Sequence, residues 1–215
     1  CRIQTAAIMT GFEKELISNP ADLVIVVGDV TSTMACSITA KKLNTKVAHI
    51  EAGIRSFDLS MPEEINRMVT DSITDYFFTT SEFANENLRK SGVPEERIFF
   101  TGNVMIDTLL ANRSRFKKPE LWDHLGLEEK KFIIVTLHRP VNVDDPDNLG
   151  RLLSAITDSA KGLPVIFPVH PRTKKVLQSC SPAVLRSLGP SPALHLTEPL
   201  GYLEFNYLVE RAFAV

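Results

Sequence analysis

Short apolar runs rich in β-branched residues alternate along this chain with segments of helical periodicity. Residues 22–27 read DLVIVV, and residues 132–137 and 164–169 repeat the pattern as FIIVTL and PVIFPV. Continuous runs of this kind predict strands that are covered on both faces of a sheet. Because helical patterns lie between the strands, we expect parallel sheets with right-handed crossovers, which is an α/β fold.

A change of composition divides the sequence into two parts. Residues 112–131 are charged and irregular and contain Pro119 and Gly126, which indicates a domain boundary. We therefore expect one Rossmann-like domain at residues 1–113 and a second at residues 114–215. Two such domains joined by a linker would form a cleft, and ligands bind preferentially at interfaces of that kind.

Composition excludes several classes of protein. The 215 residues are 44% hydrophobic and 23% charged, which predicts a packed core and not a disordered chain. The formal net charge of −2 argues against nucleic-acid binding by phosphate neutralisation, and no apolar run is long enough to span a membrane. The three cysteines (Cys1, Cys36 and Cys180) are far apart, without metal-ligand spacing. We expect no metal and a cytoplasmic location.

Carboxylates follow the first two expected strands. Asp29 comes after residues 22–27, and Glu51 comes after a strand expected at residues 46–50. Because the carboxyl ends of parallel strands face the ligand crevice, both should project toward one place, where paired carboxylates suit proton transfer. Asp29 could equally cap the next helix, as could residues 31–33. Glu51, at the end of a buried strand, needs a partner or a raised pKa.

Glu63 has a structural explanation that competes with a catalytic one. Ser60 and Glu63 have the S-x-x-E spacing of a capping box at the start of a helix. Glu63 and Arg67 also have the i,i+4 spacing of an ion pair on one helix face. Spacing alone therefore favours the structural role.

Basic residues follow two strands of the second part. His138 and Arg139 come after residues 132–137, and His170 with Arg172 comes after residues 164–169. A lone histidine is more often structural, but two basic pairs on one rim favour a phosphate-bearing ligand. The glycine-rich fingerprints of dinucleotide-binding folds and P-loops do not occur.

Several motifs, taken in order, resemble the non-hydrolysing UDP-N-acetylglucosamine 2-epimerases. They are HIEAGIRS with PEEINR, then DYFFTTSEFANENL, then GNVMIDTLL, so that the resemblance covers nearly the whole chain. It implies two Rossmann-like domains of glycosyltransferase B (GT-B) type, the second binding the nucleotide, with the active site in the interdomain cleft. It also implies a cofactor-free isomerase of polysaccharide biosynthesis that interconverts UDP-GlcNAc and UDP-ManNAc. The family eliminates UDP to leave 2-acetamidoglucal and then adds UDP back.

The resemblance further implies roles for individual residues. Asp29, Glu51 and Glu63 match the family's three active-site carboxylates, which reverses the structural interpretation of Glu63. His138, in LHRPVN, matches a histidine that contacts the diphosphate. The segment EPLGYLEF resembles the uridine-binding loop. The residues expected to bind substrate are Arg67, Arg139, His170, Leu200 and Phe205.

The family's G-T-R-P-E and D-S-G-G…E segments do not occur in this sequence. We therefore expect an internal fragment of a longer protein, with the first strand-helix unit of one domain missing and the other domain truncated. The full-length protein is expected to be a homodimer. The alternatives are a hydrolysing epimerase that releases ManNAc and UDP, a glycosyltransferase of the same architecture, and a nucleotide-sugar-binding remnant without catalysis.

Overall fold

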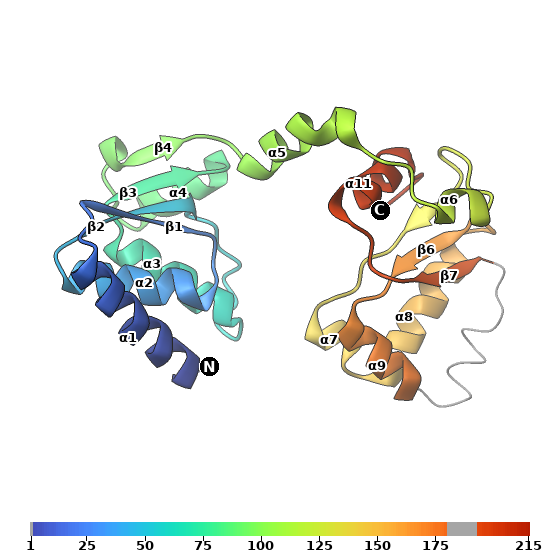
Figure 1. Ribbon diagram of the computed structural model, residues 1–215, viewed down its shortest axis with the longest axis horizontal. Helices are drawn as coiled ribbons and strands as arrows, with labels where there is room; N and C mark the ends of the chain where they lie inside the picture. The colour runs from blue at the N-terminus through green and yellow to red at the C-terminus, as the bar shows by residue number, and fades with distance from the viewer. Residues whose placement is uncertain (1, 180–192) are drawn as a thin grey trace. The chain divides into compact units, whose positions relative to one another are not determined.

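The computed structural model describes residues 2–179 and 193–215. The chain divides into two compact units, residues 1–110 and 111–215, and each unit has its own parallel sheet (Figure 1). The expectation of parallel sheets with helical crossovers is therefore confirmed.

The elements of the first unit alternate between helix and strand. They are α1 (Arg2–Ser18), β1 (Leu23–Val27), α2 (Thr31–Lys42), β2 (Lys46–Ala52), α3 (Pro62–Ile73), β3 (Tyr76–Thr79), α4 (Glu82–Lys90), η1 (Glu95–Arg97), β4 (Ile98–Phe100) and α5 (Val104–Asn112), which runs across the boundary between the units.

The second unit follows the same alternation with shorter strands. Its elements are η2 (Arg113–Arg115), α6 (Leu121–His124), β5 (Ile133–Ile134), α7 (Pro140–Val143), α8 (Pro146–Ser159), β6 (Val165–Pro168), α9 (Pro171–Ser179), β7 (Leu194–Thr197) and α11 (Tyr202–Arg211). The sequence predicts a helix at residues 174–188 with a break at residues 181–182. The helix α9 begins earlier, at Pro171, and the predicted break lies outside the described residues.

Local signals set the ends of α4. The Oγ of Ser81 accepts a hydrogen bond from the Ala84 N–H at 3.2 Å, which satisfies one of the donors that a helix start leaves free. Gly92 follows the helix with a φ of +83°, a conformation that glycine adopts without a Cβ penalty. Serine is a favoured residue at a helix start and glycine just after a helix end, so the sequence predicts both ends.

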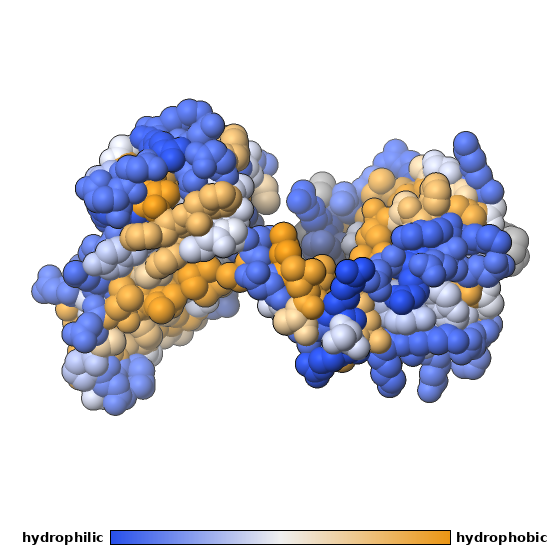
Figure 2. Space-filling model, turned by 90° about the horizontal axis from the view of Figure 1, so that it is seen from above, coloured by the Kyte–Doolittle hydropathy of each residue, from blue (hydrophilic) through white to orange (hydrophobic). Residues whose placement is uncertain are grey.

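The strand order of the first unit determines which face of its sheet the connecting helices cover. The order is β1-β2-β3-β4, so every crossover steps in the same direction, and right-handed crossovers then place all connecting helices on one face. Val24 and Val26 pack against α1 and α2 on that face. The expectation that β1 is covered on both faces is wrong, because Ile25 and Val27 are 60% and 54% exposed. Figure 2 shows a broad band of apolar side chains on this unit.

The sheet of the second unit has cover on both faces. Its order is β5-β6-β7, and Phe167 packs into one apolar cluster with α8 and α9 while Ile166 packs into another with α11. Figure 1 shows α8 and α9 on one side of β6 and α11 on the other. The sequence of residues 212–215, AFAV, predicts the start of a strand, and Ala214 forms a parallel bridge with Ile133.

Candidate functional site

Asp29 lies in the loop between β1 and α2, directly after Gly28. Its Oδ2 accepts a hydrogen bond from Nη2 of Arg67 on α3, and its carbonyl oxygen accepts one from Nδ2 of Asn66 at 2.8 Å. The Asp29 side chain is 31% exposed. The ion pair with Arg67 therefore leaves the carboxylate open to solvent and to a ligand.

The capping role considered for Asp29 is wrong. The N-cap residue of α2 is Val30, and within the described part of the chain this helix start has no side-chain cap. Thr33, another expected cap, instead donates its hydroxyl to the Val27 carbonyl at 2.7 Å. A guanidinium makes a stronger, charge-assisted hydrogen bond to a carboxylate than a backbone N–H does, and Arg67 is in reach of Asp29.

Glu51 lies at an irregularity of β2. The register of the pairing between β2 and β3 shifts between Ile50 and Ala52, and Glu51 has a φ of +74°. The left-handed region costs a residue with a side chain roughly 1–2 kcal/mol. Bulges redirect side chains, and such strain is found mostly at functional sites.

Glu51 and Asp29 follow neighbouring strands. β1 pairs with β2 so that Val27 is opposite Ile50, and both carboxylates come at the carboxyl edge of the sheet. The Oε2 of Glu51 is 3.3 Å from the position that a Cβ on Gly28 would occupy. Because Gly28, which directly precedes Asp29, has no side chain, the Glu51 carboxylate has room beside it.

Glu63 is exposed in the first turn of α3, and both structural roles considered for it are wrong. The N-cap residue of this helix is Met61, and the Ser60 hydroxyl donates to Oδ1 of Asp58 at 2.6 Å, so the capping box does not form. Arg67 pairs with Glu64 and Asp29 and not with Glu63. None of these contacts gives Glu63 a structural role.

Glu64, the next residue, is the carboxylate that has a structural role. It is 1% exposed, and it accepts hydrogen bonds from the backbone N–H and hydroxyl of Ser56 at 2.8 and 2.9 Å and from the Phe57 N–H at 3.2 Å. Burial by itself raises the pKa of Glu64, but the hydrogen bonds from Ser56, Arg67 and Phe57 outweigh it and hold the pKa below its ordinary value. Glu64 thus fixes the loop that follows β2. Sequence reasoning missed this role, because two adjacent glutamates give no signal of which one turns inward.

In the second unit, the basic residues come at the ends of adjacent strands. His138 and Arg139 lie in the loop from β5 to α7, and His170 directly precedes α9 after β6; all three are exposed. Since β5 and β6 are neighbours in the sheet, the two basic segments share its carboxyl edge. The side chain of Arg172 lies outside the described part of the structure.

Leu200 and Phe205 are half-buried around the start of α11, where both pack against the apolar cluster of Phe132 and Leu208. Leu200 also lines a cavity of about 430 Å³ whose walls include Lys117 and Lys118. The cavity lies beside the carboxyl end of β7.

Among the described residues, no group of three or more His, Cys, Asp or Glu side chains is arranged to hold a metal ion. The three predicted carboxylates with Arg67 belong to the first unit. His138, Arg139, His170, Leu200 and Phe205 belong to the second.

A protein-family profile described as UDP-N-acetylglucosamine 2-epimerase matches residues 2–215. The chain belongs to this family. A UDP-N-acetylglucosamine 2-epimerase homolog of Methanococcus maripaludis is 41% identical over 97% of the chain. A UDP-2,3-diacetamido-2,3-dideoxy-D-glucuronate 2-epimerase of Pseudomonas aeruginosa is 35% identical, also over 97% of the chain. The chain spans 58% and 56% of the length of these relatives.

The crystal structure of Methanocaldococcus jannaschii UDP-GlcNAc 2-epimerase in complex with UDP-GlcNAc and UDP matches this epimerase-family chain with a TM-score of 0.82 at 36% identity. The match covers 97% of this chain and 58% of that one. The expected fold class, two Rossmann-like parallel-sheet units of GT-B type, is confirmed. Within residues 2–179 and 193–215, no helix is both long and apolar enough to cross a bilayer.

Proposed function

We propose that the full-length protein is a non-hydrolysing UDP-N-acetylglucosamine 2-epimerase, an isomerase that interconverts UDP-GlcNAc and UDP-ManNAc without a cofactor. The observation that carries the proposal is the placement of Asp29 and Glu51 at adjacent strand ends in a chain of this family. The strained backbone at Glu51 and the solvent access of Asp29 support it.

The proposed reaction has two halves. A carboxylate removes the proton from C2 while the bond between C1 and the diphosphate oxygen breaks, which gives 2-acetamidoglucal and UDP. The diphosphate oxygen then adds back to C1 while an acid protonates C2 from the opposite face. Removal and return on opposite faces need two positioned acid–base groups, and Asp29, Glu51 and Glu63 are the candidates.

The departing diphosphate needs positive charge to stabilise it. His138, Arg139 and His170 are proposed for this role, because they are exposed at one edge of the second sheet. Leu200 and Phe205 are proposed to contact the uridine. Arg67 is proposed to reach the substrate from the Asp29 side, since it already holds that carboxylate.

Sequence identity alone does not decide which UDP-sugar is the substrate. The relative whose name specifies a diacetamido-glucuronate is 35% identical to this chain, and the Methanocaldococcus jannaschii relative named for UDP-GlcNAc is 37% identical. UDP-2,3-diacetamido-2,3-dideoxy-D-glucuronate is therefore the second candidate substrate for the same chemistry.

The test is to incubate the full-length gene product with UDP-GlcNAc in D2O and to follow both sugars by NMR. Deuterium at C2 of UDP-GlcNAc and of newly formed UDP-ManNAc is the expected result. The second UDP-sugar, supplied in a parallel reaction, distinguishes the two candidate substrates by their rates of exchange.

Other products would contradict the proposal in specific ways. Accumulation of free ManNAc with UDP indicates a hydrolysing epimerase, and turnover that requires an added sugar acceptor indicates a glycosyltransferase. Heat of UDP-GlcNAc binding without any product indicates a binding remnant. We further propose that the full-length protein acts as a homodimer in the cytoplasm, which gel filtration with light scattering and cell fractionation would test.

A further inference from the structure

The backbone at Glu51 holds a conformation that an L-residue avoids, so something must hold it in place. Its φ is +74°, and its neighbours Ile50 and Ala52 pair with β3 in different registers. Strained conformations persist only where the surrounding contacts over-determine them. The contacts on either side of Glu51 therefore decide where its carboxylate points.

Asp71, on α3, fastens both sides of Glu51. Its Oδ1 is 2.7 Å from Nδ1 of His49, two residues before Glu51. Its Oδ2 accepts the backbone N–H of Gly53, two residues after Glu51, at 3.1 Å. His49 and Asp71 are 0% and 6% exposed, so one buried carboxylate holds the chain at both ends of the irregularity.

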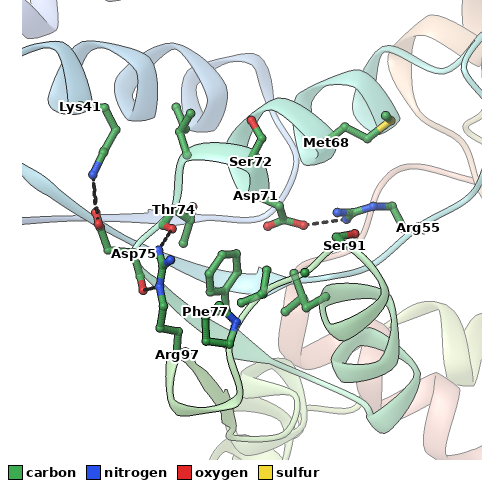
Figure 3. A pocket seen from close by; sticks show the side chains of 15 residues that line it. Lys41, Arg55, Met68, Asp71, Ser72, Thr74, Asp75, Phe77, Ser91 and Arg97 are labelled. Atoms are coloured by element: carbon green, nitrogen blue, oxygen red, sulfur yellow. Dashed lines mark hydrogen bonds and ion pairs between the residues drawn. The ribbon is translucent and has the colours of Figure 1, made fainter.

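The charge of Asp71 is itself compensated. Its Oδ2 lies 2.7 Å from Nη1 of Arg55, whose side chain is only 10% exposed. Figure 3 shows Asp71 and Arg55 pointing toward one another on the wall of a pocket of about 610 Å³. With Arg55 and Gly53 both donating to Oδ2, Asp71 is suited to remain an acceptor toward His49.

His49 connects Asp71 to Gly28, the residue that directly follows β1. Its Nε2 is 2.9 Å from the carbonyl oxygen of Gly28; a carbonyl only accepts, so Nε2 must donate. Gly28 in turn donates its N–H to the Ile50 carbonyl at 3.0 Å. The chain of contacts from Asp71 thus reaches the residues next to both Glu51 and Asp29.

We propose that Asp71 and His49 are positioning residues that hold Glu51 for proton transfer, with Arg55 keeping Asp71 in place. The inference rests on the proposed epimerase function, which gives Glu51 its reaction. Neither residue touches substrate in this proposal; each acts through the backbone that carries Glu51.

Asp71→Asn in the full-length protein tests the proposal, with Asp75→Asn as the matched control. Asp75 also binds β2, accepting the Val47 N–H at 2.8 Å and pairing with Lys41 at 2.9 Å, but it does so at the opposite end of the strand from Glu51. Asp71→Asn should lower kcat roughly 10- to 100-fold with KM unchanged within about threefold, since small misplacements of reacting groups have effects of that size. Asp75→Asn should leave kcat per folded molecule within about twofold of the wild type.

Two further measurements keep the result decisive. A crystal structure of the Asp71→Asn protein should show Glu51 relaxed out of positive φ, whereas an unchanged Glu51 would overturn the proposal, as would equal kcat in the two variants. If Asp71→Asn fails to fold, Arg55→Gln removes the ion pair with Asp71, together with the hydrogen bond from Arg55 to the Ile54 carbonyl, and should give a smaller loss of kcat at constant KM. A wild-type protein that does not exchange the C2 proton contradicts the proposed function; the positioning of Glu51 is then decided by its φ in the variant crystal structure.

Discussion

Arg67 on α3 donates its Nη2 to Oδ2 of Asp29, a residue 38 positions earlier in the loop that follows β1. The same guanidinium donates Nη1 to the buried Glu64 at 3.2 Å. One cation therefore joins a carboxylate that solvent can reach to one that it cannot, and it ties the start of α3 to the edge of the sheet.

Replacing Arg67 with methionine should destabilise the first unit by about 3 kcal/mol, because it leaves Glu64 buried without a cation. The matched control is Arg89→Met. Arg89 also joins two carboxylates, Glu82 and Glu95, but these pairs are exposed and should contribute much less. Urea denaturation of both variants measures the difference, and equal losses would contradict the role of burial.

Glu64 should make stability depend on acid pH. Its pKa is held below the ordinary value in the folded chain, so its contribution is fully present above the unfolded pKa of about 4.3 and disappears as pH falls through the folded pKa. Glu64→Gln should lower the free energy of unfolding at pH 7 by about 1–3 kcal/mol. The difference from the wild type should shrink as the pH falls below about 4.3, the unfolded pKa. A difference that stays constant with pH would show that the charge of Glu64 is unimportant.

Gly53→Ala should be far more damaging than Gly92→Ala. Both glycines have positive φ, at +79° and +83°, so each substitution carries the same backbone penalty of roughly 1–2 kcal/mol. A Cβ at position 53 would also lie 2.5 Å from the carbonyl oxygen of Ala84, whereas position 92 has nothing within 4 Å. Amide hydrogen exchange in β2 should rise in the first variant and stay near wild type in the second.

Glu63 and Glu64 should respond oppositely to the same substitution. Asp29→Asn, Glu51→Gln and Glu63→Gln should each lower turnover by roughly 10²–10⁴, as expected for acid–base groups, and Glu63→Gln should leave stability unchanged because Glu63 is exposed. Glu64→Gln is the control, since it should lower stability more than turnover per folded molecule. A Glu63→Gln protein with normal turnover would remove Glu63 from the proposed chemistry.

His138→Ala should weaken UDP binding as well as turnover, because the proposed partner of His138 is the diphosphate. Isothermal titration with UDP gives the affinities. A His138→Ala protein that binds UDP normally yet turns over slowly would move His138 from anion binding to proton transfer.

The sequence by itself determined the order of helices and strands. Apolar runs and helical periodicity predict β1 at residues 22–27, β4 at residues 98–100 and α11 at residues 202–211, all within one residue of the observed bounds. The reason is that burial of apolar side chains is the main force that shapes such elements. The Ser81 cap and the Gly92 stop were equally local, since both depend on backbone geometry within one turn. The resemblance to the epimerase family was also evident from motifs in the sequence alone.

Only the tertiary structure decided which polar groups meet. Arg67 forms ion pairs with Asp29 and Glu64 and not with Glu63. Asp71, on α3, forms hydrogen bonds with His49 and Gly53. The bare face of β1 follows from the strand order and the handedness of crossovers, which the run DLVIVV does not reveal. Hydrogen bonds and ion pairs depend on distances between segments far apart in the chain, and residue spacing along the sequence does not contain those distances.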